Sequence, residues 1–199
     1  MRLYGFALLP QKWIQEQFVA FQNRYRDEIG GPVLGMDTNL PHTSILQCPY
    51  REDVCYDEYL QLAESAIESA WGEAYYQPSG WLFARVHRTS EMKRLHHALF
   101  EETKNLIDVS QIDQTRDLSG LNELEQRNYK SYGYRYLGSE YRPHVTLGRA
   151  HEGTTYIPLQ LAQAFHKQFT GRTLRYDRIV FYEAGEYGAL KRVISERSL

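Results

Sequence analysis

The sequence lacks several features that would place it in a well-defined class of protein. Two cysteines, Cys48 and Cys55, are too few for a disulfide framework or a zinc site. No run of about 18 apolar residues occurs, and the N-terminus has no apolar signal-peptide core. We therefore expect a cytoplasmic protein without a membrane partner.

A basic excess is also missing, because the formal net charge is −2. Proteins that wrap long nucleic acids usually carry such an excess, since they neutralise many phosphates. We therefore expect no extended nucleic-acid surface, and any nucleic-acid partner should be small or held locally. The remaining composition, with 42% hydrophobic and 24% charged residues, is typical of globular proteins. The length of 199 residues fits one domain covering 1–199, or two small lobes that share one core, and we expect a monomer.

Hydrophobic spacing changes between the periods of strands and helices along the chain. Strands are expected at 2–9, 42–47, 81–87, 132–137, 143–149, 174–183 and 189–195. Helices are expected at 11–28, 54–71, 90–107, 121–130 and 158–169. The polar residues 108–120 are expected to form a loop. This order indicates an α+β fold with helices packed on sheets.

Two segments that lie far apart in the chain share a pattern of proline, histidine and a hydroxyl residue. Residues 41–46 read Pro-His-Thr-Ser-Ile-Leu, and residues 143–148 read Pro-His-Val-Thr-Leu-Gly. Side chains two positions apart lie on the same face of a strand, so each strand presents one imidazole and one hydroxyl together. These residues are His42 with Ser44 and His144 with Thr146.

Two such strands facing each other would surround one small anion with two imidazoles and two hydroxyls. One imidazole would remove a proton from the attacking oxygen, and the other would protonate the leaving oxygen. Histidine suits both roles because its pKa lies near neutrality. The hydroxyls would donate hydrogen bonds to non-bridging phosphate oxygens. The pattern therefore predicts phosphodiester chemistry without a metal.

The bare pattern of histidine and a hydroxyl two residues later is weak evidence, because His87-Arg88-Thr89 also fits it. That third match lacks the preceding proline and lies where a strand is expected to run into a helix. The pair is more specific, since proline, histidine, hydroxyl and apolar strand recur together. The alternative is two unrelated strands whose histidines are satisfied by their surroundings.

The sequence resembles the 2H phosphoesterase superfamily, and within it the bacterial RNA 2′,3′-cyclic phosphodiesterases, also called 2′-5′ RNA ligases. Three segments carry the likeness. They are Arg-Leu-Tyr-Gly-Phe-Ala-Leu-Leu-Pro (2–10), Arg-Pro-His-Val-Thr-Leu-Gly-Arg (142–149) and Ile-Val-Phe-Tyr-Glu-Ala-Gly-Glu-Tyr-Gly-Ala-Leu (179–190). Their order and spacing extend over nearly the whole chain.

The resemblance implies two pseudo-symmetric lobes, each an antiparallel sheet with helices on its outer face, with an active-site groove between them. It also implies that no cofactor or metal is needed and that His42, Ser44, His144 and Thr146 form the catalytic set. Two features depart from the family pattern. Ser44 stands where threonine is commoner, and the polar stretch 108–140 is long, which puts the identity of the substrate in doubt.

Further residues are candidates for substrate binding in the groove. The alternation of 81–87 places Trp81, Phe83 and Arg85 on one face, where the aromatic rings could stack a base and the arginine could hold a phosphate. Tyr4 and Phe6 share a face of the first strand, and Tyr134 lies between Tyr132 and Tyr136 in a possible lid hairpin. For each of these aromatic groups the alternative is a purely structural role.

Adjacent histidines at 96 and 97 also raise the question of a metal site. On a helix, neighbouring residues point about 100° apart, which is poor geometry for joint ligation. We therefore expect His96 and His97 to lie on a solvated helix face.

Three kinds of function remain open at the level of the sequence. The leading hypothesis is hydrolysis of a small or terminal phosphodiester, most simply a nucleoside or RNA 2′,3′-cyclic phosphate, to a 2′-phosphate. The first alternative uses the same residues for cleavage of 2′-5′-linked or cyclic oligonucleotides, or for 2′-5′ RNA ligation. The second alternative is a nucleotide- or RNA-binding module without catalytic activity. All three take a small nucleotide or an RNA terminus as the partner.

Overall fold

Residues 2–199, which the computed structural model describes apart from the side chain of residue 187, contain seven strands joined into one antiparallel sheet. The strand order is β2-β1-β6-β3-β4-β5, and β7 also pairs with β6. The strands are β1 (Tyr4–Pro10), β2 (Thr43–Cys48), β3 (Ile67–Gln77), β4 (Trp81–Val86), β5 (His144–Arg149), β6 (Thr173–Ala184) and β7 (Leu190–Ser198).

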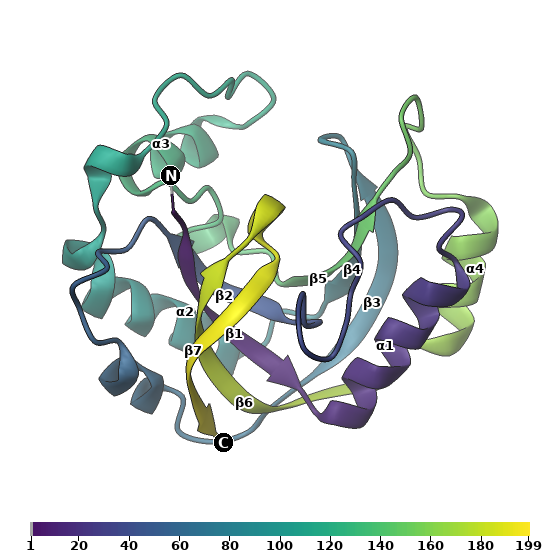
Figure 1. The fold of residues 1–199 in the computed structure, drawn as a ribbon, viewed down its shortest axis with the longest axis horizontal. Coiled ribbons are helices and arrows are strands. Elements are labelled where there is room, and N and C mark those ends of the chain that lie inside the picture. The colour runs from purple at the N-terminus through teal and green to yellow at the C-terminus, as the bar shows by residue number, and fades with distance from the viewer. Residues whose placement is uncertain (1) are drawn as a thin grey trace.

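The helices lie in two groups on either side of the molecule (Figure 1). The α-helices are α1 (Lys12–Arg24), α2 (Ser90–Thr103), α3 (Glu123–Tyr132) and α4 (Leu159–Gln168). Short 3-10 helices are η1 (Asp57–Leu62), η2 (Lys104–Leu106), η3 (Val109–Gln111), η4 (Gly138–Glu140) and η5 (Glu186–Gly188). We call β1, β2, β6 and β7 with α2 and α3 the first lobe, and β4, β5 and most of β3 with α1 and α4 the second lobe. The predicted α+β fold is confirmed.

Strand β3 joins the sheets of the two lobes. Its first residues, from Ile67 to Ala70, pair with β6, whereas the part from Trp71 onward pairs with β4. The pairing with β4 is interrupted by a bulge between Trp71 and Ala74. Bulges bend and twist a strand, so this one helps to turn the second sheet relative to the first.

Each lobe is covered by a helix that follows a strand of the other lobe. Helix α1 follows β1, yet its Phe18 stacks on Trp71 of β3 with ring centroids 5.2 Å apart. Helix α2 follows β4, yet it packs against β2. Since each connection crosses from one lobe to the other, neither lobe can complete its core without the other.

Gly148 lies at a tight approach between β5 and the loop after α1. The backbone N–H of Gly30 donates to the carbonyl of Arg149 at 2.7 Å, and the N–H of Arg149 donates back at 3.1 Å. Gly148 has a φ of +149°, and a Cβ there would overlap Ile29 and lie 2.5 Å from the carbonyl oxygen of Gly30. Only glycine fits this position without moving the second motif strand.

Two of the predicted elements are wrong. Residues 54–71 do not form one helix, because η1 ends at Leu62 and β3 begins at Ile67. The composition of these residues favours a helix. A strand forms instead because residues from Ile67 onward lie between β6 and β4, where the large apolar Trp71 is buried. The strand predicted at 132–137 is also absent, because Gly133, with a φ of +73°, ends α3 and the following residues pair with no strand in the described chain.

The other predicted strands and helices correspond to elements of the structure, with ends that shift by a few residues. Within residues 2–199, no helix combines the length and apolar character that crossing a membrane requires.

We predict that Gly148→Ala lowers the free energy of unfolding by about 2–4 kcal/mol, because alanine is strained at this positive φ and its methyl group collides with the loop backbone. Chemical denaturation measures this change. Gly120→Ala is the matched control, since a Cβ added at Gly120 would meet nothing within 4 Å and should change stability little. Equal stabilities for the two variants would contradict the described packing.

Candidate active site

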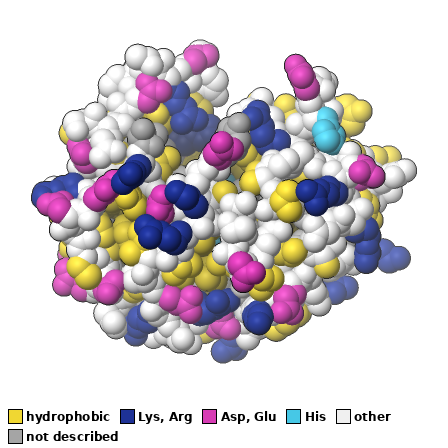
Figure 2. Space-filling view, viewed as in Figure 1, with side chains coloured by type: hydrophobic (Ala, Val, Ile, Leu, Met, Phe, Trp, Pro, Cys, Tyr) yellow, Lys and Arg dark blue, Asp and Glu magenta, His cyan; other side chains and the backbone are white. Residues whose placement is uncertain are grey.

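The two motif strands meet at a groove between the lobes. Cα atoms of β2 and β5 approach to within 8 Å, although the strands lie at opposite ends of the sheet. A pocket in this groove is lined by His42 from the first motif and by Thr146 from the second, together with Trp81 and Leu190. In the space-filling view a notch separates the upper parts of the two lobes (Figure 2). The fold therefore brings together parts of both motifs that are far apart in the chain.

Both motif histidines are held by the same backbone contact. The Nδ1 atom of His42 lies 2.8 Å from the carbonyl oxygen of Leu40, and the Nδ1 atom of His144 lies 2.8 Å from the carbonyl oxygen of Arg142. A carbonyl oxygen can only accept, so each Nδ1 carries the proton and each Nε2 keeps a lone pair. Among residues 2–199, no hydrogen bond reaches either Nε2 atom.

The electrostatics of the groove keep both imidazoles neutral when the site is empty. Burial lowers the pKa of His144 to about 4 against the opposing effect of the Arg142 carbonyl, and the nearby His42 contributes to this lowering. Burial also lowers the pKa of His42, against the opposing effect of the Leu40 carbonyl. An anion between the two rings would favour their charged forms and raise these pKa values.

The hydroxyl of the first motif is oriented by residues of the same lobe. Gln47 Nε2 donates to the hydroxyl of Tyr182 at 2.9 Å, and the Tyr182 hydroxyl lies 3.1 Å from Ser44 Oγ. Burial raises the pKa of Tyr182 to about 12, so its hydroxyl keeps its proton. Tyr182 can then donate to Ser44, which leaves the Ser44 proton for a ligand in the groove.

On the second lobe, aromatic residues of β4 lie beside the second motif. Arg85 pairs with His144 and Phe83 with Thr146 in the β4–β5 register, so these side chains share the groove face. The ring of Phe83 lies 4.0 Å from that of His144, and Trp81 stacks on Phe83 at 6.3 Å. The structure thus places Trp81, Phe83 and Arg85 where the sequence alternation predicted.

A bulge in each motif strand changes which face of the sheet the following residues point to. In β2 the pairing with β1 skips one residue between Ser44 and Leu46, and in β5 the pairing with β4 skips Leu147. Simple alternation predicts that Arg149 points away from the groove, but its guanidinium lies 5.3 Å from the ring of Trp81. The same displacement directs Gln47 toward Tyr182. These two residues therefore occupy equivalent places on the groove face of the two lobes.

Tyr4 and Phe6 do not line this groove, contrary to the sequence prediction. Ala7 pairs with Ser44, so the neighbouring positions of β1 face the other side of the sheet. There Phe6 is fully buried in the aromatic core, and Tyr4 stacks on Phe181 at 5.9 Å. Alternation identifies two faces of a strand, but tertiary packing decides which of them is covered by helices.

The segment after α3 contacts the second motif, although it is not the expected hairpin. Tyr136 packs its ring against His144 at 5.9 Å and against Tyr134 at 5.8 Å. Burial raises the pKa of Tyr134 well above its usual value, and interactions with Tyr141 and Tyr182 add to this effect. Tyr136 therefore lies against the second motif, and Tyr134 lies beside Tyr136, within electrostatic reach of Tyr182.

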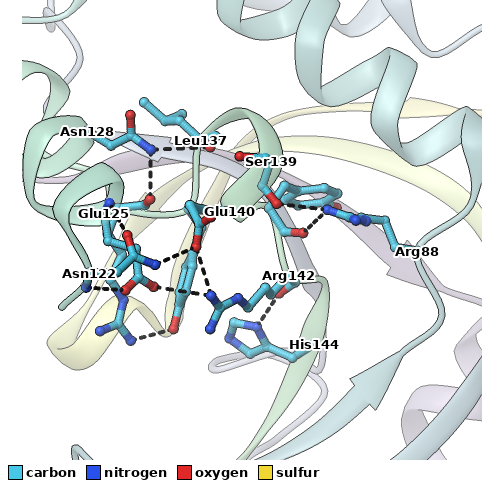
Figure 3. Close-up of polar contacts among 12 residues, drawn as sticks. Arg88, Asn122, Glu125, Asn128, Leu137, Ser139, Glu140, Arg142 and His144 are labelled. Carbon is cyan, nitrogen blue, oxygen red and sulfur yellow. Dashed lines mark hydrogen bonds and ion pairs between the residues drawn. The ribbon is translucent and has the colours of Figure 1, made fainter. Parts of the chain in front are cut away.

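A network of polar side chains holds the backbone that leads into the second motif (Figure 3). Asn128 Nδ2 donates to the carbonyl of Leu137, and Arg88 donates to the carbonyls of Ser139 and Tyr141. Arg142 pairs with Glu140 at 2.8 Å, and its carbonyl holds His144. None of these residues was marked by the sequence, because their roles depend on backbone positions that only the fold defines.

His96 is a further residue whose role the sequence did not reveal. It is buried instead of solvated, and it stacks on Tyr141 with ring centroids 4.4 Å apart. Its Nδ1 donates to the carbonyl of Ile45 at 2.7 Å, and its Nε2 accepts from the N–H of Gly138 at 3.1 Å. One side chain of α2 thus connects the first motif strand to the segment that precedes the second motif.

The environment of His96 leaves neither of its ring nitrogens available to a metal. Both ring nitrogens of His96 are used by backbone groups. Within the described part of the chain, no three His, Cys, Asp or Glu side chains are grouped so that they could hold a metal ion.

Comparison with solved structures identifies this arrangement as the 2H phosphoesterase fold, as the sequence resemblance predicted. The crystal structure of TT0787 of Thermus thermophilus has a TM-score of 0.60 and 18% identity, with 100% of this chain and 98% of that chain covered. E. coli LigT complexed with 3′-AMP has a TM-score of 0.57 and 12% identity, with coverages of 100% and 98%. LigT complexed with phosphate has a TM-score of 0.56 and 12% identity, with coverages of 100% and 97%. No protein-family model matches the sequence, and no curated protein matches it either.

We predict that stability falls as the pH drops below about 6.5, before carboxylates titrate. Burial lowers the pKa values of His42, His96 and His144 in the folded state, so the unfolded chain takes up protons at higher pH and is stabilised relative to the folded chain. For His144 the loss extends from about pH 6.5 to about pH 4. Denaturant unfolding at pH 7.5, 6 and 5 measures it.

The matched variants for this test are His96→Gln and His97→Gln. The buried His96 contributes to the pH dependence, so its replacement should lower stability at pH 7.5 and flatten the fall toward pH 5. His97 is exposed, so its replacement should change neither the stability at pH 7.5 nor the fall in stability toward pH 5. A wild-type stability that is constant between pH 7.5 and 5 would contradict the described burial.

Proposed function

We propose that this protein is a metal-independent phosphodiesterase that hydrolyses a small or terminal phosphodiester, most simply a 2′,3′-cyclic phosphate to a 2′-phosphate. The proposal depends mainly on one observation. The two motif histidines have the same Nδ1 contact to a backbone carbonyl, and their Nε2 atoms are unbonded within residues 2–199. A purely structural histidine would use both nitrogens, as His96 does.

Each histidine has a distinct role in the proposed reaction. Nε2 of His144 accepts a proton from water as the water oxygen forms a bond to phosphorus. The bond between phosphorus and the 3′ oxygen breaks, and Nε2–H of protonated His42 donates its proton to that oxygen. The low pKa of His144 keeps it neutral, as a base must be. The substrate anion raises the pKa of His42 and so provides the acid.

The remaining groove residues stabilise the phosphate and orient the nucleoside. Ser44 and Thr146 donate hydrogen bonds to non-bridging oxygens, whose charge grows in the transition state. Trp81, Phe83 and Tyr134 supply aromatic surface for a base. LigT, which has this fold, has been crystallised with phosphate and with 3′-AMP, and these complexes support the proposal that the groove binds a nucleotide.

The site also accounts for the alternatives that the sequence left open. Cleavage of 2′-5′-linked or cyclic oligonucleotides would use the same two imidazoles. RNA ligation would also use them, because the acid and the base exchange roles when the reaction runs in reverse. A binding module without activity has no need of two opposed imidazoles with unbonded Nε2 atoms. We therefore favour an enzyme with hydrolysis as its forward reaction.

We predict that His42→Ala and His144→Ala each lower kcat on 2′,3′-cyclic AMP by roughly 10²- to 10⁴-fold, the usual contribution of one general acid or base. Wild-type activity should persist in EDTA, because side chains supply both proton transfers. Ser44→Ala should have a milder effect, since it removes one donor among several. Steady-state kinetics with EDTA present measure these changes, and His97→Gln is the control.

A substrate with an acidic leaving group separates the two roles, because its departing oxygen needs little protonation. Such a substrate should partly restore the activity of His42→Ala and leave His144→Ala impaired. Near-full activity of either alanine variant on 2′,3′-cyclic AMP would contradict the paired mechanism. Activity lost in EDTA and recovered with a divalent ion would show that the chemistry needs a metal.

A further inference from the structure

His96 of α2 forms a hydrogen bond to the bulge that lies next to the first motif. The pairing of β2 with β1 skips Ile45, which is an extra residue in this register. Ile45 is fully buried, and a buried backbone carbonyl needs a hydrogen-bond donor. Nδ1 of His96 lies 2.7 Å from this carbonyl oxygen and supplies that donor. The imidazole therefore stabilises the backbone that directly follows Ser44.

The other side of the same ring holds the segment that leads to the second motif. His96 Nε2 accepts from the backbone N–H of Gly138 at 3.1 Å, and the ring stacks on Tyr141 with an interplanar angle of 7°. Tyr141 directly precedes Arg142, whose carbonyl oxygen lies 2.8 Å from Nδ1 of His144. One buried side chain outside the groove therefore contacts the backbone next to both motifs.

Both hydrogen bonds form only when His96 is neutral and carries its proton on Nδ1. Ile45 offers a carbonyl oxygen, which accepts, and Gly138 offers an N–H, which donates. An imidazolium would direct a second N–H toward the N–H of Gly138 and break that bond. The link between the two motif regions therefore depends on an uncharged ring.

The surroundings of His96 favour this uncharged ring. Burial lowers the pKa of His96 against the opposing effect of a backbone carbonyl, and the charges of His97 and Arg88 also lower it. Arg88 is fixed near the ring because it donates to the carbonyls of Ser139 and Tyr141 (Figure 3). Tyr141, which covers the ring, keeps its proton because burial raises its pKa well above the usual value.

We propose that His96, as a neutral imidazole, is a positioning residue for the catalytic groups of both lobes. Its Nδ1 stabilises the bulge that directs Gln47 toward Tyr182 and Ser44. Its Nε2 holds the segment that ends at His144. This inference rests on the proposed function and adds to it a residue that does not touch the substrate.

Two substitutions separate the two contacts, because amide side chains of different length replace different ring nitrogens. In His96→Asn the amide NH₂ reaches the position of Nδ1 and still donates to Ile45, but the acceptor for Gly138 is lost. In His96→Gln the amide oxygen reaches the position of Nε2 and still accepts from Gly138, but the donor to Ile45 is lost. Both variants lose the stack on Tyr141, so the difference between them reports the hydrogen bonds. His97→Gln is the matched control on an exposed position of the same helix.

The ¹⁵N signals of the histidine rings test the second contact without relying on turnover, because their chemical shifts differ between the two tautomers. In the wild type at pH 7.5, His42 and His144 should both be protonated on Nδ1. In His96→Asn the signals of His144 should move toward the mixed tautomers of a free imidazole, whereas those of His42 stay unchanged. In His96→Gln and His97→Gln both rings should keep the wild-type tautomer.

Turnover of 2′,3′-cyclic AMP tests the first contact. We expect His96→Asn to lower kcat by roughly 10- to 100-fold, the effect of displacing a catalytic group by about 1 Å. His96→Gln should have the milder effect of Ser44→Ala, because it acts through the same hydroxyl. Adding Ser44→Ala to His96→Gln should therefore lower kcat little further, whereas the effects of Ser44→Ala and His96→Asn should multiply.

A purely structural His96 would give a different result. Both variants would then be less stable but keep wild-type kcat and tautomers while folded, and this outcome would overturn the proposal. A His144 tautomer that changes equally in His96→Asn and His96→Gln would overturn it too. Absence of turnover in the wild type would contradict the proposed function alone, because the tautomer measurement needs no substrate.

Arg88→Gln provides a second test if a His96 variant does not fold. Arg88 is exposed, and its replacement removes the other hydrogen bonds to the same segment without changing the core. The signals of His144 should again move toward mixed tautomers while those of His42 stay unchanged. An unchanged His144 tautomer in folded Arg88→Gln would show that this segment does not position the ring, and it would overturn the proposal.

Discussion

The site depends on one hydrogen bond that occurs twice, from an imidazole Nδ1 to the carbonyl of the residue two positions earlier. In both motifs a proline separates the two partners, as Leu40-Pro41-His42 and Arg142-Pro143-His144. Proline fixes its own φ and keeps the preceding residue extended, so it limits the ways in which the carbonyl can approach the ring. The bond defines the tautomer and leaves Nε2 of each ring for the groove. The rest of the fold brings the two imidazole rings, each with a defined tautomer, to the same groove.

The two lobes have similar strands but present different surfaces to the groove. In the first lobe the positions beside the motif strand are small, with Gly5, Ala7 and Val180 next to Ser44 and Tyr182. In the second lobe the equivalent surface has aromatic rings of β3 and β4 with a guanidinium group over each of Tyr75 and Trp81. A pseudo-symmetric pair of imidazoles therefore lies in an asymmetric groove. Under the proposed function, this asymmetry would give a bound nucleotide one preferred direction, with its base against the aromatic surface of the second lobe.

Much of this arrangement could be predicted from the sequence, because strand alternation depends only on the local backbone. The pairing of histidine and hydroxyl on one strand face, and the placement of Phe83 and Arg85, need only the alternation of a strand. Alternation failed at Arg149, since the bulge at Leu147 adds a residue that no local pattern announces. The hairpin turn before β4 contains Pro78 and Gly80, which could have indicated the missed strand β3.

Other features depend on tertiary structure and have no local signal. Burial of His96 follows from the packing of α2 on β2, and the residues around it in the sequence do not distinguish it from the exposed His97. Tyr4 and Phe6 alternate as groove residues would, but their face of the sheet is buried in the aromatic core. The segment between Gly133 and Arg142 is held by side chains of α2, α3 and the β4–α2 connection, so its contact with His144 cannot be read from its own residues.

The central claim is that one phosphate contacts both imidazoles, and nuclear magnetic resonance tests it most directly. Inorganic phosphate would be titrated into protein with ¹⁵N-labelled histidine, and the Nε2 resonances of the seven histidines followed at constant pH. Assignments come from His42→Ala and His144→Ala. The account predicts that the Nε2 signals of His42 and His144 both shift along one saturation curve, that of His42 toward the protonated form, while His97 stays unchanged. A shift of only one of the two, or two curves with different affinities, would contradict the claim that they flank a single phosphate.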